Sequence, residues 1–208
     1  MNKNISLSTP ASYLKLVAWA FLTVFAGNFI IKDALPYFDL QQDYFGRFWN
    51  VKWWLVGHIT GGLLALVVGP FQFWKSFRTK YITIHRWLGR TYLVAILTGT
   101  ICSTYLAWTS GLAIHWSWAI ALQGLALAWI CTAAMAYISI IKRRIEQHRE
   151  WMIRSYVVTF AFVIFRWLNE LTAVKELGNF VERGPTEIWV SWAIPLFVTE
   201  IILQWKKK

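Results

Sequence analysis

The sequence predicts an all-α integral membrane protein with six transmembrane helices, and three observations support that fold class. The 208 residues are 57% hydrophobic and only 15% charged, with a mean hydropathy of +0.44. Six apolar stretches reach the roughly 18 residues that cross a bilayer as a helix. Many of the 15 Trp residues lie at the ends of these stretches, where aromatic side chains gather at a membrane interface. The stretches are residues 14–31, 53–74, 88–107, 116–141, 151–171 and 188–205.

The first two stretches have distinct features. The first follows a polar N-terminus and has only a weak match to a signal-peptide cleavage site, so we expect an uncleaved helix. The second is rich in small residues, which favour either close helix packing or clearance for a flat cofactor beside His58. Gly69-Pro70 is expected to end or kink this helix. The small residues are Gly57, Gly61, Gly62, Ala65 and Gly69.

The remaining stretches complete a four-helix core. The second and third stretches form one predicted hairpin, and the fourth and fifth form another. A short connection, residues 107–115, joins the two hairpins and contains no Lys, Arg, Asp or Glu. The first and sixth stretches flank this core. Little of the chain lies outside the six stretches, so residues 1–208 are predicted to form a single transmembrane domain.

Lys and Arg are distributed unevenly between the two predicted sides of the membrane. Fifteen of them lie in the N-terminus, the second and fourth loops and the C-terminal tail, and five lie on the other side. This bias predicts that both termini are cytoplasmic in a multi-pass protein of the inner (plasma) membrane. The net charge of +11 therefore sets orientation and favours anionic lipids on the cytoplasmic face over nucleic acid. The sequence leaves open a homo-oligomer or a membrane complex.

Two basic elements of similar sequence lie where loops enter the third and fifth stretches. The first is His85-Arg86-Trp87-Leu88-Gly89-Arg90-Thr91-Tyr92. The second is His148-Arg149-Glu150-Trp151-Met152-Ile153-Arg154-Ser155-Tyr156, which has one extra residue before its second Arg. The repetition suggests a duplicated two-helix unit related by an axis along the membrane normal.

One functional hypothesis is a b-type haem protein that transfers electrons. His58 and His115 have similar predicted depths toward the outside, and His85 and His148 have similar depths toward the inside. His is a common haem ligand, so His58, His85 and His148 are candidate metal ligands in the bundle. The layout is similar to that of the two-haem cytochrome b family that uses ascorbate, although His85, His115 and His148 lie at span edges. The haem propionates would pair with Arg86, Arg90, Arg149 and Arg154.

The same residues support two other hypotheses. A helix N-terminus presents free N–H groups and a positive dipole end, so both His-Arg elements could hold an anion or a lipid headgroup. The protein would then be a non-redox carrier or binding protein. A third hypothesis is a structural or assembly subunit. The sequence has no Walker loop, dinucleotide fingerprint or HExxH motif, and it does not decide whether the protein is an enzyme.

Charged residues within the apolar stretches are expected to be paired, because an unpaired charge in a bilayer is costly. Arg166 precedes Glu170 by four residues, which places both on one helix face and predicts an ion pair. Glu200 lies at a depth similar to that of Arg154, which predicts a second pair between neighbouring helices. Cys102 and Cys131 lie at different depths, so we expect buried thiols and no disulfide.

The order of these motifs resembles an uncharacterised family of bacterial predicted membrane proteins, domain of unknown function 2306. The resemblance rests on His58-Ile59-Thr60-Gly61 with Gly69-Pro70-Phe71-Gln72-Phe73, and on the two His-Arg elements. Arg166 and the Trp192 to Glu200 stretch are similar to the last two helices of the family, and the resemblance extends from about Leu14 to Trp205. It implies an integral membrane protein and carries no assigned activity. His115 does not belong to the family pattern.

Overall fold

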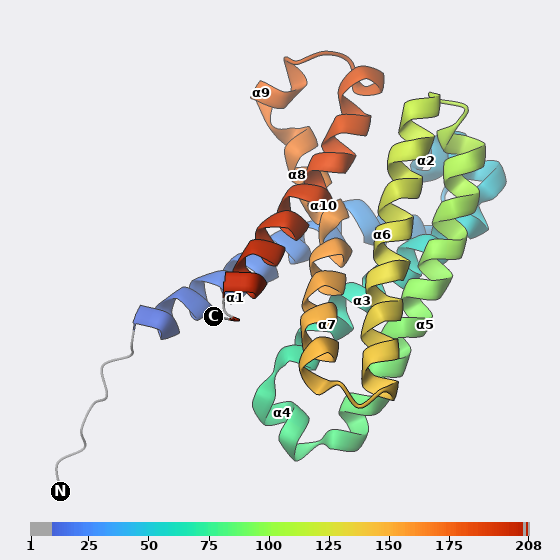
Figure 1. The fold of residues 1–208 in the computed structure, drawn as a ribbon. Helices are drawn as coiled ribbons and strands as arrows, with labels where there is room; N and C mark the ends of the chain where they lie inside the picture. Colours follow the sequence, from blue (N-terminus) through green and yellow to red (C-terminus); the bar gives the residue numbers. More distant parts are fainter. Residues whose placement is uncertain (1–9, 206, 208) are drawn as a thin grey trace, which may run out of the picture.

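The structure is a computed structural model that describes residues 10–205 and 207, and all regular elements in that part of the chain are helical. Ten α-helices are joined by short 3₁₀ and π-helical segments (Figure 1). The helices are α1 Pro10–Phe29, α2 Gln42–Phe45, α3 Lys52–Phe73, α4 Lys75–Lys80, α5 Ile82–Leu106, α6 Trp116–Ile141, α7 Ile145–Thr159, α8 Ala161–Glu170, α9 Thr172–Lys175 and α10 Phe180–Trp205.

Five helical segments of the described chain are long and apolar enough to cross a membrane. They are Gln42–Phe73, Ile82–Gly111, Trp116–Ile141, Ile145–Glu170 and Phe180–Trp205. These five correspond to the second to sixth predicted spans, so the all-α class and these helices are confirmed. The first predicted span, residues 14–31, falls largely on α1, which is not among the five. The count of six spans and the orientation of the termini stay predictions.

The five long segments pack into a bundle in chain order. α3 packs along α5, α6 packs along α7, and α10 packs against α6, α7 and α8. α5 lies at one edge of the bundle and α10 at the opposite edge (Figure 1). The second half of α1 packs against α8 and α3 through residues such as Phe25 and Phe29, while its first half extends away from the bundle.

Glycines bring α3 and α5 into backbone contact. A Cβ atom on Gly61 would lie 2.5 Å from the Ala95 carbonyl oxygen and 2.8 Å from the Gly99 nitrogen. A Cβ atom on Gly57 would lie 2.8 Å from the Cys102 sulfur. The space beside these glycines is therefore filled by the chain itself. Close helix packing is confirmed at Gly57 and Gly61, which leave no clearance for a flat cofactor, whereas a Cβ on Gly62 would meet nothing within 4 Å.

Pro70 does not end α3, which continues to Phe73, but it changes the hydrogen bonding of the helix. Proline has no N–H, so the Leu66 carbonyl one turn earlier loses its helical donor. The Tyr156 hydroxyl of α7 donates to that carbonyl at 3.2 Å. Gly69 makes room for the Tyr156 ring, because a Cβ at this position would lie 2.2 Å from it. Gly69 and Pro70 thus provide the surface that Tyr156 of the second His-Arg element contacts.

α5 and α7 begin earlier than predicted, at Ile82 and Ile145 rather than at residues 88 and 151. The His85 N–H donates to the Tyr81 carbonyl at 3.0 Å, and the His148 N–H donates to the Arg144 carbonyl at 2.9 Å. The His-Arg elements therefore lie inside helices. The prediction that the two elements open helices was wrong, because hydropathy placed the helix starts after the charged residues.

Both cysteines are free, and they differ in environment. Cys102 is buried against Gly57, as expected. Cys131 is exposed on the surface of the bundle, so the expectation that it is buried was wrong. Within the helices that cross a membrane, an exposed apolar surface is the surface that faces lipid.

We predict that Gly61→Ala destabilises the protein and that Gly62→Ala does not. The new methyl group at residue 61 meets the backbone of α5, which cannot move without separating the helices, whereas nothing lies within 4 Å of a Cβ at residue 62. Overpacking of this kind costs roughly 1–3 kcal/mol. Thermal unfolding of the detergent-purified variants measures the difference. Equal midpoints for the two variants would contradict the backbone contact.

Candidate functional site

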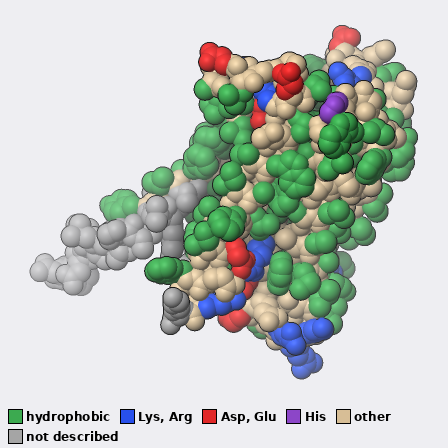
Figure 2. All heavy atoms as spheres, turned by 45° about the horizontal axis from the view of Figure 1, so that its top comes forward, with side chains coloured by type: hydrophobic (Ala, Val, Ile, Leu, Met, Phe, Trp, Pro, Cys, Tyr) green, Lys and Arg blue, Asp and Glu red, His purple; other side chains and the backbone are tan. Residues whose placement is uncertain are grey.

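The candidate site lies at one end of the bundle, which we call the basic end and define by the connections Trp74–Tyr81 and Lys142–Arg144. The basic residues of these connections are Lys75, Arg78, Lys80, Lys142, Arg143 and Arg144. Figure 2 shows Lys and Arg side chains gathered at one end of the molecule, next to a surface dominated by hydrophobic side chains.

The α6–α7 connection positions Arg144 through a Schellman motif. Arg143 adopts a left-handed conformation with φ of 57°. The Arg143 N–H donates to the Ile140 carbonyl at 3.0 Å, and the Arg144 N–H donates to the Ser139 carbonyl at 2.9 Å. These bonds satisfy the last carbonyls of α6 in the pattern that usually requires Gly. The next helix begins one residue later, which fixes Arg144 between α6 and α7.

Arg154 of α7 is buried and is held by two carboxylates. Its Nε donates to Glu200 Oε2 at 2.8 Å, and its Nη2 contacts the same oxygen. Its Nη1 lies 3.6 Å from Glu150 Oε2. The guanidinium also lies over the Trp151 ring, 4.7 Å from the ring centre. The predicted pair between Arg154 and Glu200 is confirmed.

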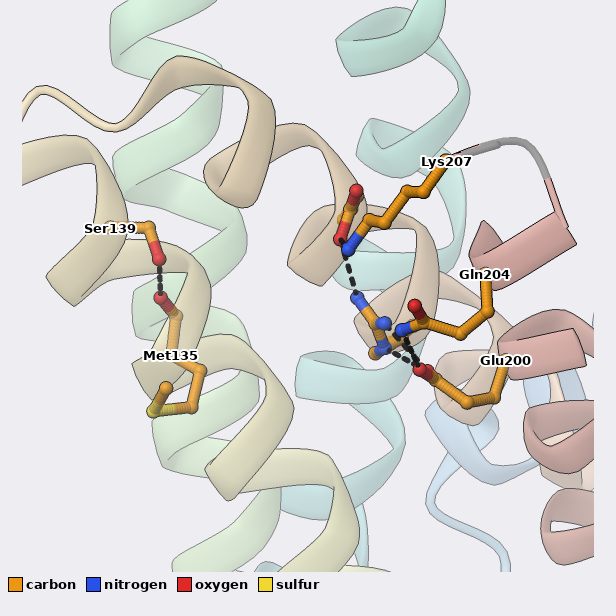
Figure 3. Close-up of polar contacts among 7 residues, drawn as sticks. Met135, Ser139, Glu200, Gln204 and Lys207 are labelled. Carbon is orange, nitrogen blue, oxygen red and sulfur yellow. Dashed lines mark hydrogen bonds and ion pairs between the residues drawn. The ribbon is translucent and has the colours of Figure 1, made fainter. Parts of the chain in front are cut away.

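The C-terminal end of α10 extends this network. The Gln204 amide donates to Glu200 Oε1 at 2.6 Å, and the Lys207 ammonium donates to Glu150 Oε2 at 3.0 Å. Glu200, Gln204 and Lys207 point from the end of the chain toward α7 (Figure 3). The network therefore holds α10 against α7 at the basic end through ion pairs of Arg154 and Lys207 with Glu150 and Glu200.

A groove lies between α6, α7 and α10 around this network. One part, which we call the apolar part, has a volume of about 370 Å³ and a mostly apolar lining. The other, which we call the charged part, has a volume of about 560 Å³ and is lined by polar and apolar surface in similar amounts. Trp151, Arg154 and Glu200 line both parts. The apolar part is also lined by Thr132, Trp192, Ala193, Leu196 and Phe197, and the charged part by Met135, Arg144, Gln147, Glu150, Gln204 and Lys207.

His85 and His148, the first residues of the two His-Arg elements, lie near each other at the basic end. Arg78, Arg86 and His148 are close enough to act on His85 electrostatically. His85 Nδ1 and the Gln72 amide nitrogen are buried and have no hydrogen-bond partner among the described residues. His148 Nδ1 lies 2.9 Å from the Ala136 carbonyl oxygen, which accepts, so this nitrogen carries a proton. The predicted similarity of depth for His85 and His148 is supported.

His58 lies apart from this cluster, between α3 and α5. Its Nδ1 lies 3.1 Å from the Gly99 carbonyl oxygen, so this nitrogen also carries the proton. Its ring contacts the Phe162 ring at a centre-to-centre distance of 5.7 Å. His115 instead caps α6, where its Nδ1 accepts from the Ser117 N–H at 3.3 Å. Among the described residues, no three His, Cys, Asp or Glu side chains lie close enough together to hold a metal ion.

The hydroxyl residues of the two elements meet in the bundle interior. The Tyr92 hydroxyl lies 3.0 Å from both Ser155 Oγ and Thr159 Oγ1. The Trp129 indole N–H donates to Thr159 Oγ1 at 2.8 Å. Tyr92 and Ser155 are fully buried, so these bonds connect α5, α6 and α7 within an apolar core. Interior polar contacts of this kind hold membrane helices together.

The other charged residues differ from the predictions. Arg166 pairs with Asp33, with Nε and Oδ1 3.7 Å apart, and Glu170 pairs with Lys175 at 3.1 Å. The predicted Arg166–Glu170 pair was wrong, because each side chain reaches a partner outside its own helix. Of the predicted arginines, only Arg154 is buried, whereas Arg86, Arg90 and Arg149 are exposed.

A second buried polar cluster, toward the opposite end of the bundle, was missed by the sequence interpretation. Arg183 pairs with the buried Glu187 on α10 and donates to Asn169 Oδ1 of α8 at 2.8 Å. The four-residue spacing of Arg183 and Glu187 on a helix is the signal that could have predicted this pair.

Comparison with known proteins assigns the chain to a family. A family model described as "Predicted membrane protein (DUF2306)" matches residues 55–203. The chain therefore belongs to the DUF2306 family of predicted membrane proteins and is a multi-pass membrane protein. The match begins within α3, so the earlier part of the expected resemblance lies outside it. No curated protein and no solved structure matches the chain.

We predict that Glu200→Gln destabilises the protein more than Glu170→Gln does. Removing the Glu200 charge leaves buried Arg154 with Glu150 at 3.6 Å as its remaining carboxylate, whereas Glu170 and Lys175 form an exposed pair. The expected losses are roughly 1–3 kcal/mol for Glu200 and at most about 1 kcal/mol for Glu170. Thermal unfolding in detergent provides the comparison. A larger loss for Glu170→Gln would be inconsistent with the network at α10.

Proposed function

We propose that the protein is a non-redox membrane binding protein whose groove between α6, α7 and α10 holds an amphiphile with an anionic headgroup. The observation that carries this proposal is the division of the groove into an apolar part and a charged part that share Trp151, Arg154 and Glu200. A membrane lipid has the same division between acyl chain and headgroup. We also propose that the basic end is cytoplasmic, because Lys and Arg are enriched on that side of membrane proteins.

The apolar part of the groove suits an acyl or similar chain. Leu196, Phe197 and Trp192 of α10 face Trp151 of α7 and Thr132 of α6 across it. The volumes of both parts fall in the range of roughly 300–1,000 Å³ that is typical of small-molecule sites. A chain bound there would cover apolar surface of α10, on which Phe197 is exposed.

The charged part of the groove favours a negatively charged headgroup. Glu150 and Glu200 are engaged by Arg154, Lys207 and Gln204. Arg144, in contrast, makes no ion pair with any described residue. The three cations and two carboxylates of the lining leave one positive charge in excess, and Gln147 of the same lining adds an amide. Arg144 is therefore the group that we expect to contact a phosphate.

The haem hypothesis remains a prediction about His58, His85 and His148. Its support is that His58 and His148 each hydrogen-bond a carbonyl through Nδ1, as metal-bound histidines do. The packing beside His58 does not fit a haem, since the spaces at Gly57 and Gly61 are filled by the chain's own atoms. An absorption spectrum of protein made with sufficient haem, oxidised and then reduced, tests this alternative directly.

We predict that purified protein retains phosphatidylglycerol in preference to phosphatidylcholine with the same acyl chains, as measured by native mass spectrometry. Arg144→Gln should weaken the retention of phosphatidylglycerol about fivefold, because an arginine near a lipid headgroup contributes about 1 kcal/mol. Lys142→Gln removes the same charge from the same connection without lining the groove, and should change nothing.

A second pair of variants tests the apolar part. Leu196→Trp fills the groove and should abolish most lipid retention, whereas Leu127→Trp adds the same bulk to an exposed position on α6 and should not. If wild-type protein retained both lipids equally, and Leu196→Trp had no effect, the groove would not be a lipid site.

A further inference from the structure

The two His-Arg elements place the same tryptophan–arginine pair on two different helices. Trp87 and Arg90 of α5 and Trp151 and Arg154 of α7 share the pattern Trp-x-x-Arg, followed by a hydroxyl residue and Tyr. The Arg90 guanidinium lies 5.0 Å from the centre of the Trp87 ring, and the Arg154 guanidinium lies 4.7 Å from that of Trp151. Both arginines are at similar depths, about 12 Å and about 14 Å from the starts of their helices.

The similarity continues along both helices as a stripe of residues spaced three and four apart, the spacing of a helix–helix seam. On α5 the stripe is Trp87, Arg90, Val94, Leu97 and Ile101. On α7 and α8 each residue has a counterpart 64 positions later in the chain, and these are Trp151, Arg154, Val158, Ala161 and Phe165. We call these the α5 stripe and the α7 stripe.

The two stripes differ in what covers them. Val158, Ala161 and Phe165 of the α7 stripe are 2%, 1% and 3% exposed, and α10 packs along α7 and α8. Their counterparts Val94, Leu97 and Ile101 are 62%, 50% and 54% exposed. The α5 stripe lies at the edge of the bundle opposite α10, and no described helix covers it (Figure 1).

Arg154 and Arg90 also differ in whether a carboxylate pairs with them. Arg154 receives the carboxylate of Glu200 from α10. Arg90 makes no ion pair with any described residue. The α5 stripe thus shares its Trp-x-x-Arg pair and its spacing with a surface that binds a carboxylate-bearing helix, but among the described residues it has neither the helix nor the carboxylate.

We propose that the α5 stripe is a docking surface for a transmembrane helix of another membrane protein, one that carries an Asp or Glu opposite Arg90. An apolar helix would cover Val94, Leu97 and Ile101, and its carboxylate would pair with Arg90 as Glu200 pairs with Arg154. This proposal concerns a surface remote from the lipid groove and is independent of what the groove binds.

A second copy of this chain does not fit the surface. A twofold axis along the membrane normal would bring the two α5 stripes together and place Arg90 beside Arg90, which is repulsive. The described carboxylates at a similar depth are Glu150 and Glu200, and both are engaged within their own chain. Charge complementarity therefore favours a different protein.

The test is site-specific photocrosslinking in native membranes, with a benzophenone amino acid at position 97 and a matched probe at Leu127, which is exposed on α6. The probe at position 97 should give a discrete protein adduct, and the crosslinked segment should be an apolar helix with an Asp or Glu. Arg90→Glu should reduce the adduct at least about tenfold, the effect of losing a charge-assisted bond. Replacing the partner's carboxylate by Lys should restore it.

Arg90→Gln provides the same comparison with a smaller perturbation, should the charge reversal reduce expression. Thermal unfolding of both variants establishes that they are folded. The proposal would be overturned if the probe at position 97 gave only lipid adducts or crosslinked to a second copy of the chain. It would also be overturned if position 127 gave an equal adduct, or if the position-97 adduct were unchanged in both Arg90 variants.

Discussion

Arg154 is buried about 14 Å from the start of α7, where the protein itself must supply partners for the charge. Glu200 is the main partner, and it is on the last helix of the chain. This ion pair, with Gln204 and Lys207 beside it, holds the end of α10 against α7. The groove follows from that contact, because α10 is fixed at the basic end and its apolar residues then face Trp151 across an unfilled space.

The same requirement explains why the family motifs contact one another. Pro70 leaves the Leu66 carbonyl without a helical donor, and Tyr156 supplies one from α7. Gly69 is small because the Tyr156 ring lies against it. Tyr92 is buried with its hydroxyl near Ser155 and Thr159. The hydroxyl residues of the two His-Arg elements therefore stabilise the bundle interior. Of the arginines in these elements, Arg154 is buried and paired with Glu200, whereas Arg86, Arg90 and Arg149 are exposed.

Hydropathy predicted six membrane-crossing helices, of which five are confirmed, and similar depth along two helices predicted the Arg154–Glu200 pair. They failed where the outcome depends on contacts between distant segments. Arg166 pairs with Asp33, which is 133 residues earlier, and no periodicity indicates that contact. The helix starts at Ile82 and Ile145 were missed because Arg and His lower the hydropathy of turns that are still helical. The groove depends on how α10 packs against α6 and α7, which the sequence pattern does not specify.

The central claim is that an anionic lipid occupies the groove between α6, α7 and α10. The most direct measurement is crosslinking in vesicles with a phosphatidylglycerol that carries a photoactivatable group on its acyl chain, followed by mapping of the modified residues. The account predicts that adducts concentrate on Trp192, Leu196 and Phe197 of α10 and on Trp151, and that phosphatidylcholine with the same chain labels them far less. Even labelling of all lipid-facing helices, identical for the two lipids, would contradict it.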